Sequence, residues 1–308
     1  MNRNEVLYGR RYRIIVAAND GNALDVSQLR CVFKINKSMD ADPNYSEVAI
    51  FNLATGAENT MVKSGHRVFV EAGYEGDQYG LIFQGNVVQP VRSKEGGTTY
   101  KLTLYSLDGD GFANNSFVST SLARGQDAQA ILGVCLSEAG DTIERGIISE
   151  GLSSAKLSRG KVFFGQPQDY LRQLAKSQNT VLFLNDGQVN FVKATDLPPG
   201  EVIELNPSSG LVGEVTQNED GILVKSLLNP RININTLIHI SGEYVNDFQV
   251  QKGQAVNTQR LPGGGVYKVI KLTHTGDTRG NDWYTDMECI AQPGYAPSLI
   301  AGGENYIF

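Results

Sequence analysis

Cysteine and histidine are scarce in this chain of 308 residues, which contains three of each. Cys31, Cys135 and Cys289 are odd in number, lie far apart and form no C-x-x-C pair, so no disulfide framework is predicted. Buried free thiols in a protein that folds in a reducing cytoplasm are the expected state. The histidines also lack the spacing of metal ligands, and we therefore expect neither a metal site nor a cofactor.

Long apolar runs are missing as well. The run Ile14–Ala18 is too short for the core of a signal peptide, and no run approaches the roughly 18 residues that cross a membrane. We therefore expect no targeting segment and no membrane insertion. Basic residues are outnumbered, with a formal net charge of -6 and a pI of about 5.2, which argues against a free-standing nucleic-acid-binding protein.

Glycine is abundant and proline is not, with 34 and 10 residues, which favours many tight turns and a β-rich chain. The hydrophobic fraction of 41% is sufficient for packed cores. In the first third of the chain, short runs with alternating or β-branched residues are separated by turn signals. They predict strands at 13–17, 29–36, 47–53, 67–74, 81–88 and 99–107. Six strands at short spacing are typical of a barrel or a sandwich.

The period of the apolar residues changes in the middle of the chain. A helical stripe begins near Asp127, and Gly140 is the expected stop. A short strand is expected at Lys161–Phe164, and Pro167 stands where a second helix would begin. The Asn-Asp-Gly turn within residues 181–192 is a strong hairpin signal.

The last third is β again after a Leu-Pro-Pro-Gly linker at 197–200. Strands are expected at 202–205, 212–216, 222–228, 237–241, 266–274 and 283–290, with an exposed loop at about 246–265. The predicted fold class is mainly β with a small α/β module. Its domains are a first β-barrel at 1–112, a helix-plus-hairpin domain at 113–195 and a second β-barrel at 196–308.

The most catalytic-looking cluster lies between His274 and Asp282. A hydrolase would use His274 as a base oriented by Asp277 or Asp282, but neither a nucleophile nor an oxyanion hole is marked. The favoured interpretation is a hairpin loop in which Asp277 accepts hydrogen bonds from backbone amides and Arg279 is free to reach an acidic partner. We therefore predict no catalytic residues and no enzymatic activity.

Two glycine-containing runs resemble ligand loops only in part. The run Asp108–Gly111 resembles the start of a calcium loop, but Phe112 and Ser119 stand where an EF-hand needs oxygen ligands. It is interpreted as a turn between domains. The run Gly263–Gly265 lacks the strand-before, helix-after setting of a phosphate-binding loop and is interpreted as a flexible loop tip.

Basic residues cluster once, near the N-terminus, where two tyrosines interleave with them: Arg3, Arg10, Arg11 and Arg13, with Tyr8 and Tyr12. The favoured interpretation is a solvated edge strand with an N-terminal arm. A protein-docking arm is the second interpretation. Binding of single-stranded nucleic acid by stacking and phosphate contacts is the third.

Three segments, at 33–53, 210–232 and 265–289, together resemble the baseplate hub proteins of tailed bacteriophages, the family that includes the T4 and Mu-like hubs. The most telling parts are Leu-Leu-Asn-Pro-Arg at 227–231 and His-Thr-Gly-Asp-Thr-Arg-Gly at 274–280. The segment 170–192 also looks like that family's helix-plus-hairpin module. The sequence departs from the family at Asn233–Asn235, where a Pro-Gly turn is frequent.

The resemblance implies a homotrimer in which each subunit contributes two similar β-barrels to a ring of six. It implies that one face of the ring meets the tail tube protein or its initiator and that the other seats a trimeric central spike. Other baseplate proteins and, transiently, DNA in the lumen are further implied partners. The implied location is the virion tail baseplate, assembled in the host cytoplasm. No wall-cleaving segment is visible.

A cell-surface carbohydrate-binding protein of the tail tip is the alternative function. Its candidate sugar-stacking residues are Tyr244, Phe248 and Tyr306, which are as well suited to anchor a protein interface.

Overall fold

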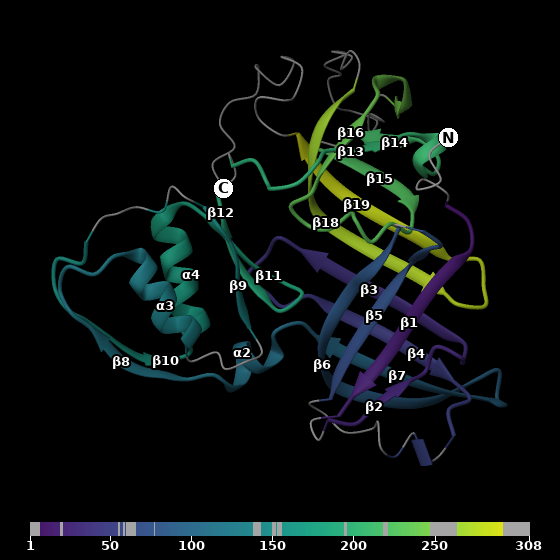
Figure 1. The fold of residues 1–308 in the computed structure, drawn as a ribbon, viewed down its shortest axis with the longest axis horizontal. Helices are drawn as coiled ribbons and strands as arrows, with labels where there is room; N and C mark the ends of the chain where they lie inside the picture. Colours follow the sequence, from purple (N-terminus) through teal and green to yellow (C-terminus); the bar gives the residue numbers. More distant parts are fainter. Residues whose placement is uncertain are drawn as a thin grey trace, which may run out of the picture.

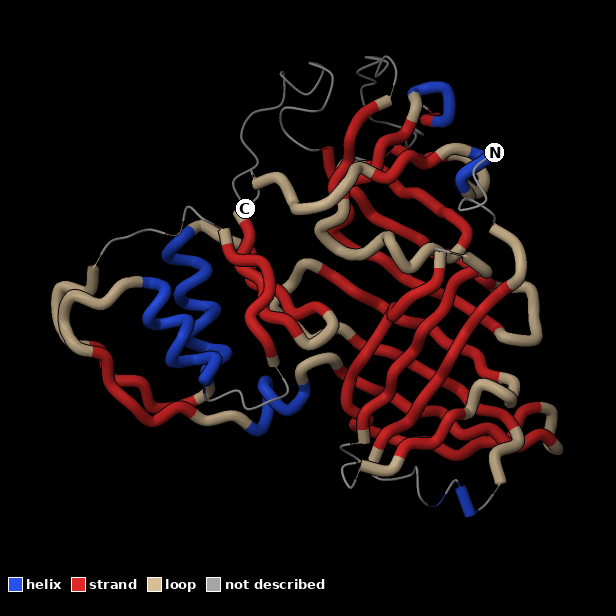
Figure 2. The backbone as a smooth tube through the Cα atoms, in the orientation of Figure 1, coloured by secondary structure: helices blue, strands red, loops and turns tan. Residues whose placement is uncertain are grey.

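The computed structural model describes residues 7–18, 21–54, 56–57, 59, 66–76, 78–137, 143–149, 152, 156–193, 196–217, 221–246 and 264–291. Two β regions lie together, and a smaller module with helices and short strands projects from them (Figures 1 and 2). The predicted fold class, mainly β with a small α/β module, is confirmed. No helix among these residues is long and apolar enough to cross a membrane.

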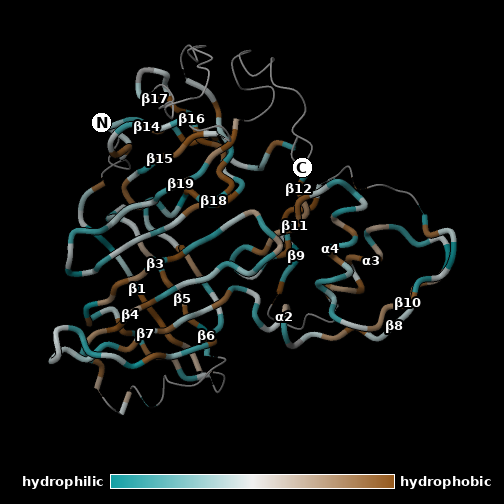
Figure 3. Tube along the Cα trace, turned by 180° about the vertical axis from the view of Figure 1, so that it is seen from behind, coloured by the Kyte–Doolittle hydropathy of each residue, from teal (hydrophilic) through white to brown (hydrophobic). Residues whose placement is uncertain are grey.

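The first β region contains all six strands that the sequence predicts. Its strands are β1 (Arg10–Ala17), β2 (Ala23–Asp25), β3 (Cys31–Ser38), β4 (Tyr45–Phe51), β5 (Arg67–Tyr74), β6 (Tyr79–Glu95) and β7 (Thr99–Leu107). The alternation in β3 buries Cys31, Phe33 and Ile35 and leaves Lys34 exposed. Figure 3 shows apolar residues recurring along these strands. The short β2 was not predicted, and β6 is longer than expected.

The α/β module has more elements than the sequence predicts. It contains α2 (Asp110–Asn115), β8 (Val118–Leu122), α3 (Ala128–Ser137), β9 (Glu144–Ile148), β10 (Lys161–Gly165), α4 (Pro167–Gln178), β11 (Val181–Asn185) and β12 (Gln188–Val192). Helix α4 starts at Pro167 as predicted, and the hairpin turn at Asp186 and Gly187 has φ angles of 50° and 78°, as a type I′ turn requires. Elements α2, β8 and β9 were missed, and Gly140 lies outside the described residues.

The second β region confirms the six predicted strands with shifted ends. Its elements are β13 (Ile203–Leu205), η3 (Pro207–Ser209), β14 (Val215–Gln217), β15 (Ile222–Leu227), β16 (Leu237–Ile240), η4 (Gly242–Tyr244), β17 (Val245–Asn246), β18 (Gly265–Asp277) and β19 (Trp283–Ala291). Strand β18 extends through His274 to Asp277, so the loop before β19 is shorter than predicted. Most of the expected loop at 246–265 lies outside the described residues.

One antiparallel pairing, between β3 and β18, joins the two β regions. The first half of β18 pairs with β16, and after a bulge between Val269 and Lys271 the second half pairs with β3 from Ser38 to Val32. The result is a 14-stranded sheet whose main path runs from β17 to β2. The pairing of the described strands does not close either region into a complete barrel.

Three groups of buried side chains form the cores of the protein. The first lies in the N-terminal β region, the second in the α/β module and the third in the C-terminal β region. These cores do not follow the order of the chain. Trp283 of β19 packs in the first core, and Phe183 of β11 packs in the third. The domain limits at residues 112 and 195 therefore remain predictions.

Candidate functional site

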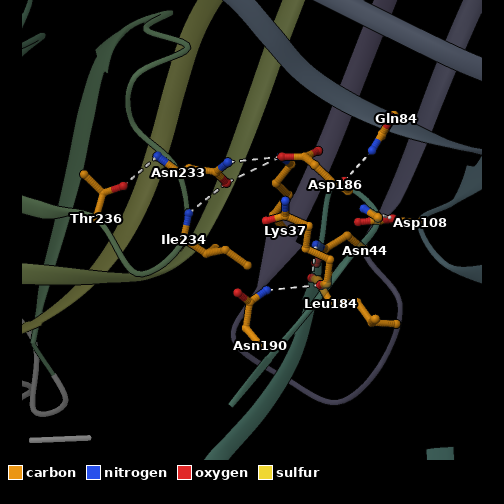
Figure 4. A network of polar contacts seen from close by, with 12 residues as sticks. Lys37, Asn44, Gln84, Asp108, Leu184, Asp186, Asn190, Asn233, Ile234 and Thr236 are labelled. Carbon is orange, nitrogen blue, oxygen red and sulfur yellow. Dashed lines mark hydrogen bonds and ion pairs between the residues drawn. The ribbon is translucent and has the colours of Figure 1, made fainter. Parts of the chain in front are cut away.

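A buried ion pair lies where the tip of the β11–β12 hairpin meets both β regions. Nζ of Lys37, a fully buried side chain on β3, lies 2.6 Å from Oδ2 of Asp186 in the hairpin turn. Nδ2 of Asn233 donates to the same carboxylate oxygen at 3.1 Å (Figure 4). Because Asn233 follows β15 and Lys37 belongs to β3, this single carboxylate ties the hairpin to both regions. We call this network the polar junction.

Two further side chains of the first β region complete the polar junction. Gln84 of β6 donates a short hydrogen bond to the backbone carbonyl of Asp186, and Oδ1 of Asp108 accepts from the Gly187 amide at 2.9 Å. Asp108 is buried, and burial together with the nearby charge of Asp186 raises its pKa to about 6. The turn is therefore fixed through its backbone as well as its side chain.

Asn44, in the turn before β4, connects the polar junction to the sheet. Its Oδ1 accepts from the Ser38 amide at 2.9 Å, and its Nδ2 donates to the Leu184 carbonyl at 2.7 Å. Its own carbonyl accepts from the Asp108 amide at 2.8 Å. One buried amide side chain thus satisfies the Ser38 amide of β3 and the carbonyl of Leu184, which lies 140 positions after Asn44 in the chain.

The run Asp108–Gly111 acts as a connection between the first β region and α2. Asp108 is committed to the Gly187 amide, and Asp110 accepts from Nδ2 of Asn114 at 2.8 Å. Gly109 adopts a left-handed φ of 76°, where its Cβ position would lie 3.0 Å from Leu184. Within the described part of the chain, no three acidic, histidine or cysteine side chains gather as metal ligands.

His274, predicted as the last residue of a strand at 266–274, lies inside strand β18, which continues to Asp277. It is fully buried, with Nδ1 2.9 Å from Oγ1 of Thr285 on the neighbouring strand. Burial, with a smaller contribution from the charge of Lys37, lowers its pKa to about 3. A neutral imidazole hydrogen-bonded to a buried threonine has no access to a substrate, so the hydrolase interpretation loses its base.

Asp277 holds the loop before β19, as predicted. Its Oδ1 accepts from the Arg279 amide at 2.9 Å, and its Oδ2 lies 2.8 Å from Nη2 of Arg30. The hydrogen bond from Arg30 is the largest cause of a lowered pKa for this carboxyl group. Arg279 is exposed, and its Nη2 donates to the Gln28 carbonyl at 3.2 Å, so its contact with an acidic partner stays a prediction. Asp282 contributes its backbone carbonyl, which accepts from the Asp277 amide.

The arginines near the N-terminus bind the protein's own surface. Arg10 donates to the carbonyls of Gly280 and Asn281 at 2.6 and 2.8 Å, and its guanidinium lies 5.3 Å from the ring centroid of Trp283. Arg11 lies over Tyr79, while Arg13 pairs with Asp25 at 3.1 Å. These contacts fix β1 to its neighbours and leave little of the cluster for a nucleic acid.

Strand β1 was predicted to be an edge strand, which is only partly correct. It pairs with β5 along its whole length, and its last residues, Ile15–Ala17, also pair with β2. Arg3 lies outside the described residues.

The candidate sugar-stacking aromatics give no support to the carbohydrate-binding alternative. Tyr244, in η4, packs against the third core and is only partly exposed. Phe248 and Tyr306 lie outside the described residues.

An open groove of about 580 Å³, lined by charged and apolar side chains, crosses the joined sheet. Lys225 and Asp286 pair across β15 and β19 at 3.3 Å, and Lys271 and Glu288 pair across β18 and β19 at the same distance. The described lining residues include neither histidine nor cysteine. A charge-balanced sheet face of this kind suits contact with water or a polar partner more than catalysis.

Solved structures with the same arrangement come from bacteriophage-derived and secretion systems. A prophage MuSo2 43 kDa tail protein from Shewanella oneidensis matches with a TM-score of 0.59 and 14% identity over 91% of this chain and 97% of its own. A tail protein from Neisseria meningitidis MC58 matches with a TM-score of 0.58 and 12% identity, over 94% and 98% of the two chains.

The fold is that of phage tail proteins. A third similar structure, the Escherichia coli c3393 protein, is a component of the type VI secretion system with structural similarity to the T4 tail proteins gp27 and gp5. It has a TM-score of 0.51 and 10% identity, over 95% of this chain and 80% of that one. The resemblance to phage hub proteins is therefore confirmed at the level of the fold. No family model and no curated protein matches the sequence.

Proposed function

We propose that this protein is a structural baseplate hub of a phage-like tail. The observation that carries the proposal is a fold shared with two tail proteins over more than nine-tenths of each chain. The order of the hub-like segments along the sequence supports the same assignment. In this proposal, most of the chain serves to hold the two β regions in a fixed relative orientation.

The proposed assembly is a homotrimeric ring of six β regions that adapts a six-fold tail tube to a trimeric central spike. The β3–β18 pairing and the polar junction support this proposal, because each fixes one β region against the other within a subunit. In such a ring the two β regions of one subunit are related by a rotation of about 60°, as closed-ring symmetry requires. The proposed location is the virion tail, with assembly in the host cytoplasm and passage of DNA through the ring.

A non-enzymatic role fits the chemistry of the site. His274 is buried and neutral, and Asp277 is committed to Arg30 and to a backbone amide. The proposed partners are therefore other tail proteins: the tube protein or its initiator, the spike and neighbouring baseplate proteins.

Mass measurement of the purified protein tests the proposed function. Native mass spectrometry and light scattering are expected to give a trimer, either alone or on mixing with the candidate spike, and a three-to-three complex with that spike. A monomer at every concentration, with the tube and spike proteins present, would contradict the proposal. Loss of turnover on a wall or glycan substrate in a His274→Gln variant that remains folded would favour an enzyme instead.

A further inference from the structure

The two-stranded ribbon β8–β10 lies at the far end of the α/β module (Figure 1), and its outer face carries exposed apolar side chains. Val118 and Phe163 point inward and are fully buried in the second core. On the outside, Phe117, Val162 and Phe164 are 51%, 73% and 72% exposed, and the rings of Phe117 and Phe164 meet edge-to-face at 5.0 Å. Two exposed rings in contact beside an exposed valine are typical of a protein contact.

One end of the ribbon and the segments that adjoin it are basic in an acidic protein. Segments 116–126 and 156–165 contain four basic residues and no acidic residue: Arg124, Lys156, Arg159 and Lys161. The remainder of the chain then holds 23 basic and 33 acidic residues, a net charge of -10. Lys161 lies over Phe163 and Tyr170, whereas the other three are exposed at the end of the ribbon. An acidic and apolar surface is the complement of this ribbon.

The chain itself carries such a surface, at Leu197–Leu205. Leu197 and Val202 are 54% and 40% exposed, and the exposed carboxylates of Glu201 and Glu204 lie between and beside them. No lysine or arginine occurs from residue 194 to residue 224. Among the described strands, β13 pairs only with β16, and Oγ of Ser209 donates to the Glu204 carbonyl of β13 at 2.8 Å.

We propose that the β8–β10 ribbon of one subunit docks on the Leu197–Leu205 segment of the next. The contact rests on the proposed ring of identical subunits and identifies the surfaces that join them. Two different patches of one chain then meet head to tail, the arrangement that closes a ring. A symmetric ribbon-to-ribbon contact is disfavoured because it brings two clusters of positive charge together.

Cysteine pairs test the contact directly. The three native cysteines are buried, so only introduced thiols will cross-link under mild oxidation. The double variant Val162→Cys and Val202→Cys is expected to give covalent dimers and trimers on a non-reducing gel. Each single variant, and the pair Tyr100→Cys with Val202→Cys on a distant exposed tyrosine, is expected to stay uncross-linked. A covalent dimer from Val162→Cys alone would overturn the proposal in favour of ribbon-to-ribbon contact.

Charge reversal separates the contact from the proposed function. Arg159→Glu and Glu201→Lys are each expected to weaken the trimer about tenfold or more, and the double variant is expected to recover most of that loss. Both residues are exposed, so circular dichroism should show an unchanged fold. A wild-type trimer that neither single variant weakens would overturn this contact while leaving the proposed hub intact.

The Arg159→Glu variant also tests whether the ribbon binds a nucleic acid instead of a second subunit. If Arg159→Glu leaves the trimer unchanged and abolishes binding of a labelled single-stranded oligonucleotide, the ribbon is a nucleic-acid surface and the proposal is wrong. A wild-type protein that is monomeric with every partner present would overturn the hub function and this contact together.

Discussion

His274 shows how burial changes the chemistry of a single residue. In the sequence it stands beside two aspartates and resembles a catalytic base. In the structure its side chain is buried, and Nδ1 forms a hydrogen bond with Oγ1 of Thr285 on the neighbouring strand. The buried environment of His274 therefore affects how the stability of the protein depends on pH. It does not make His274 a catalytic base.

We expect His274 to make the protein less stable in acid. Its folded pKa of about 3 lies below its unfolded value of 6.5, so the unfolded chain binds the extra proton between these values. The contribution of neutral His274 to the free energy of unfolding is fully present above pH 6.5. Between pH 6.5 and the folded pKa, the free energy of unfolding falls by about 1.4 kcal/mol for each pH unit. Urea unfolding at several pH values will measure this slope, and His274→Gln should remove it. The His239→Gln variant, at a partly exposed histidine that contacts Glu204, is the control and should keep this slope.

Asp108 should act in the opposite direction. Its folded pKa of about 6 lies above the ordinary value of 3.8, so the folded state binds the proton more tightly between these values. Its contribution is greatest below about pH 4 and is lost as the pH rises to 6, by on the order of 3 kcal/mol. In the same unfolding series, Asp108→Asn should flatten this part of the profile relative to the wild type. Asp42→Asn, on a largely exposed side chain, should match the wild type, and an unchanged Asp108→Asn profile would contradict the assigned burial.

The sequence could predict residues whose role is local. Asp277 holds its turn as expected because a turn aspartate binds amides two residues away. Lys37 was missed, although its position continues the buried face of Cys31, Phe33 and Ile35 in β3. A lysine in phase with a buried face was the available signal for a buried ion pair. Its partner, 149 residues later, could not be found from local pattern.

At the scale of elements, the β11–β12 hairpin shows most clearly which features the local sequence predicts and which it does not. Its Asn-Asp-Gly turn predicted the hairpin because both central residues need positive φ angles. The location of the hairpin was beyond local pattern, since it depends on side chains from β3, β6 and the end of β7. Elements α2, β8 and β9 were missed for a related reason: they are short and derive their stability from packing on the second core.

We expect the loss of one partner of the Lys37–Asp186 pair to destabilise the protein. Asp186→Ala leaves the buried ammonium group of Lys37 without its carboxylate and should cost about 3–5 kcal/mol. The double variant Lys37→Met and Asp186→Ala should recover a large part of this loss, because no buried charge remains. Denaturant unfolding of the four proteins in a double-mutant cycle will give the coupling energy.

An exposed ion pair serves as the control for that cycle. Lys225→Met and Asp286→Ala, on the outer sheet face, should change the free energy of unfolding by less than about 1 kcal/mol each. If Asp186→Ala proves equally mild, the polar junction does not hold the hairpin in place.

At the scale of the whole molecule, the sheet joins parts that the sequence separates into domains. Strand β18 pairs with β16 and β19 in the second region and with β3 in the first. Trp283 and Leu228, both from the last third of the chain, pack in the first core. The sequence predicted the strands of each region but not their union, because pairing between β3 and β18 involves residues more than 230 positions apart.

We therefore expect the two β regions to unfold together. Trp283 is the single tryptophan and reports on the first core, whereas Val269 is buried in the third. Val269→Ala should lower stability by roughly 2 kcal/mol, the cost of removing buried methyl groups. The loss should appear equally in tryptophan fluorescence and in far-ultraviolet circular dichroism during urea unfolding, since the shared sheet transmits it to the first core. Fluorescence that keeps its wild-type midpoint while circular dichroism shifts would show that the regions unfold independently, and the β3–β18 pairing would then be too weak to hold a hub subunit rigid.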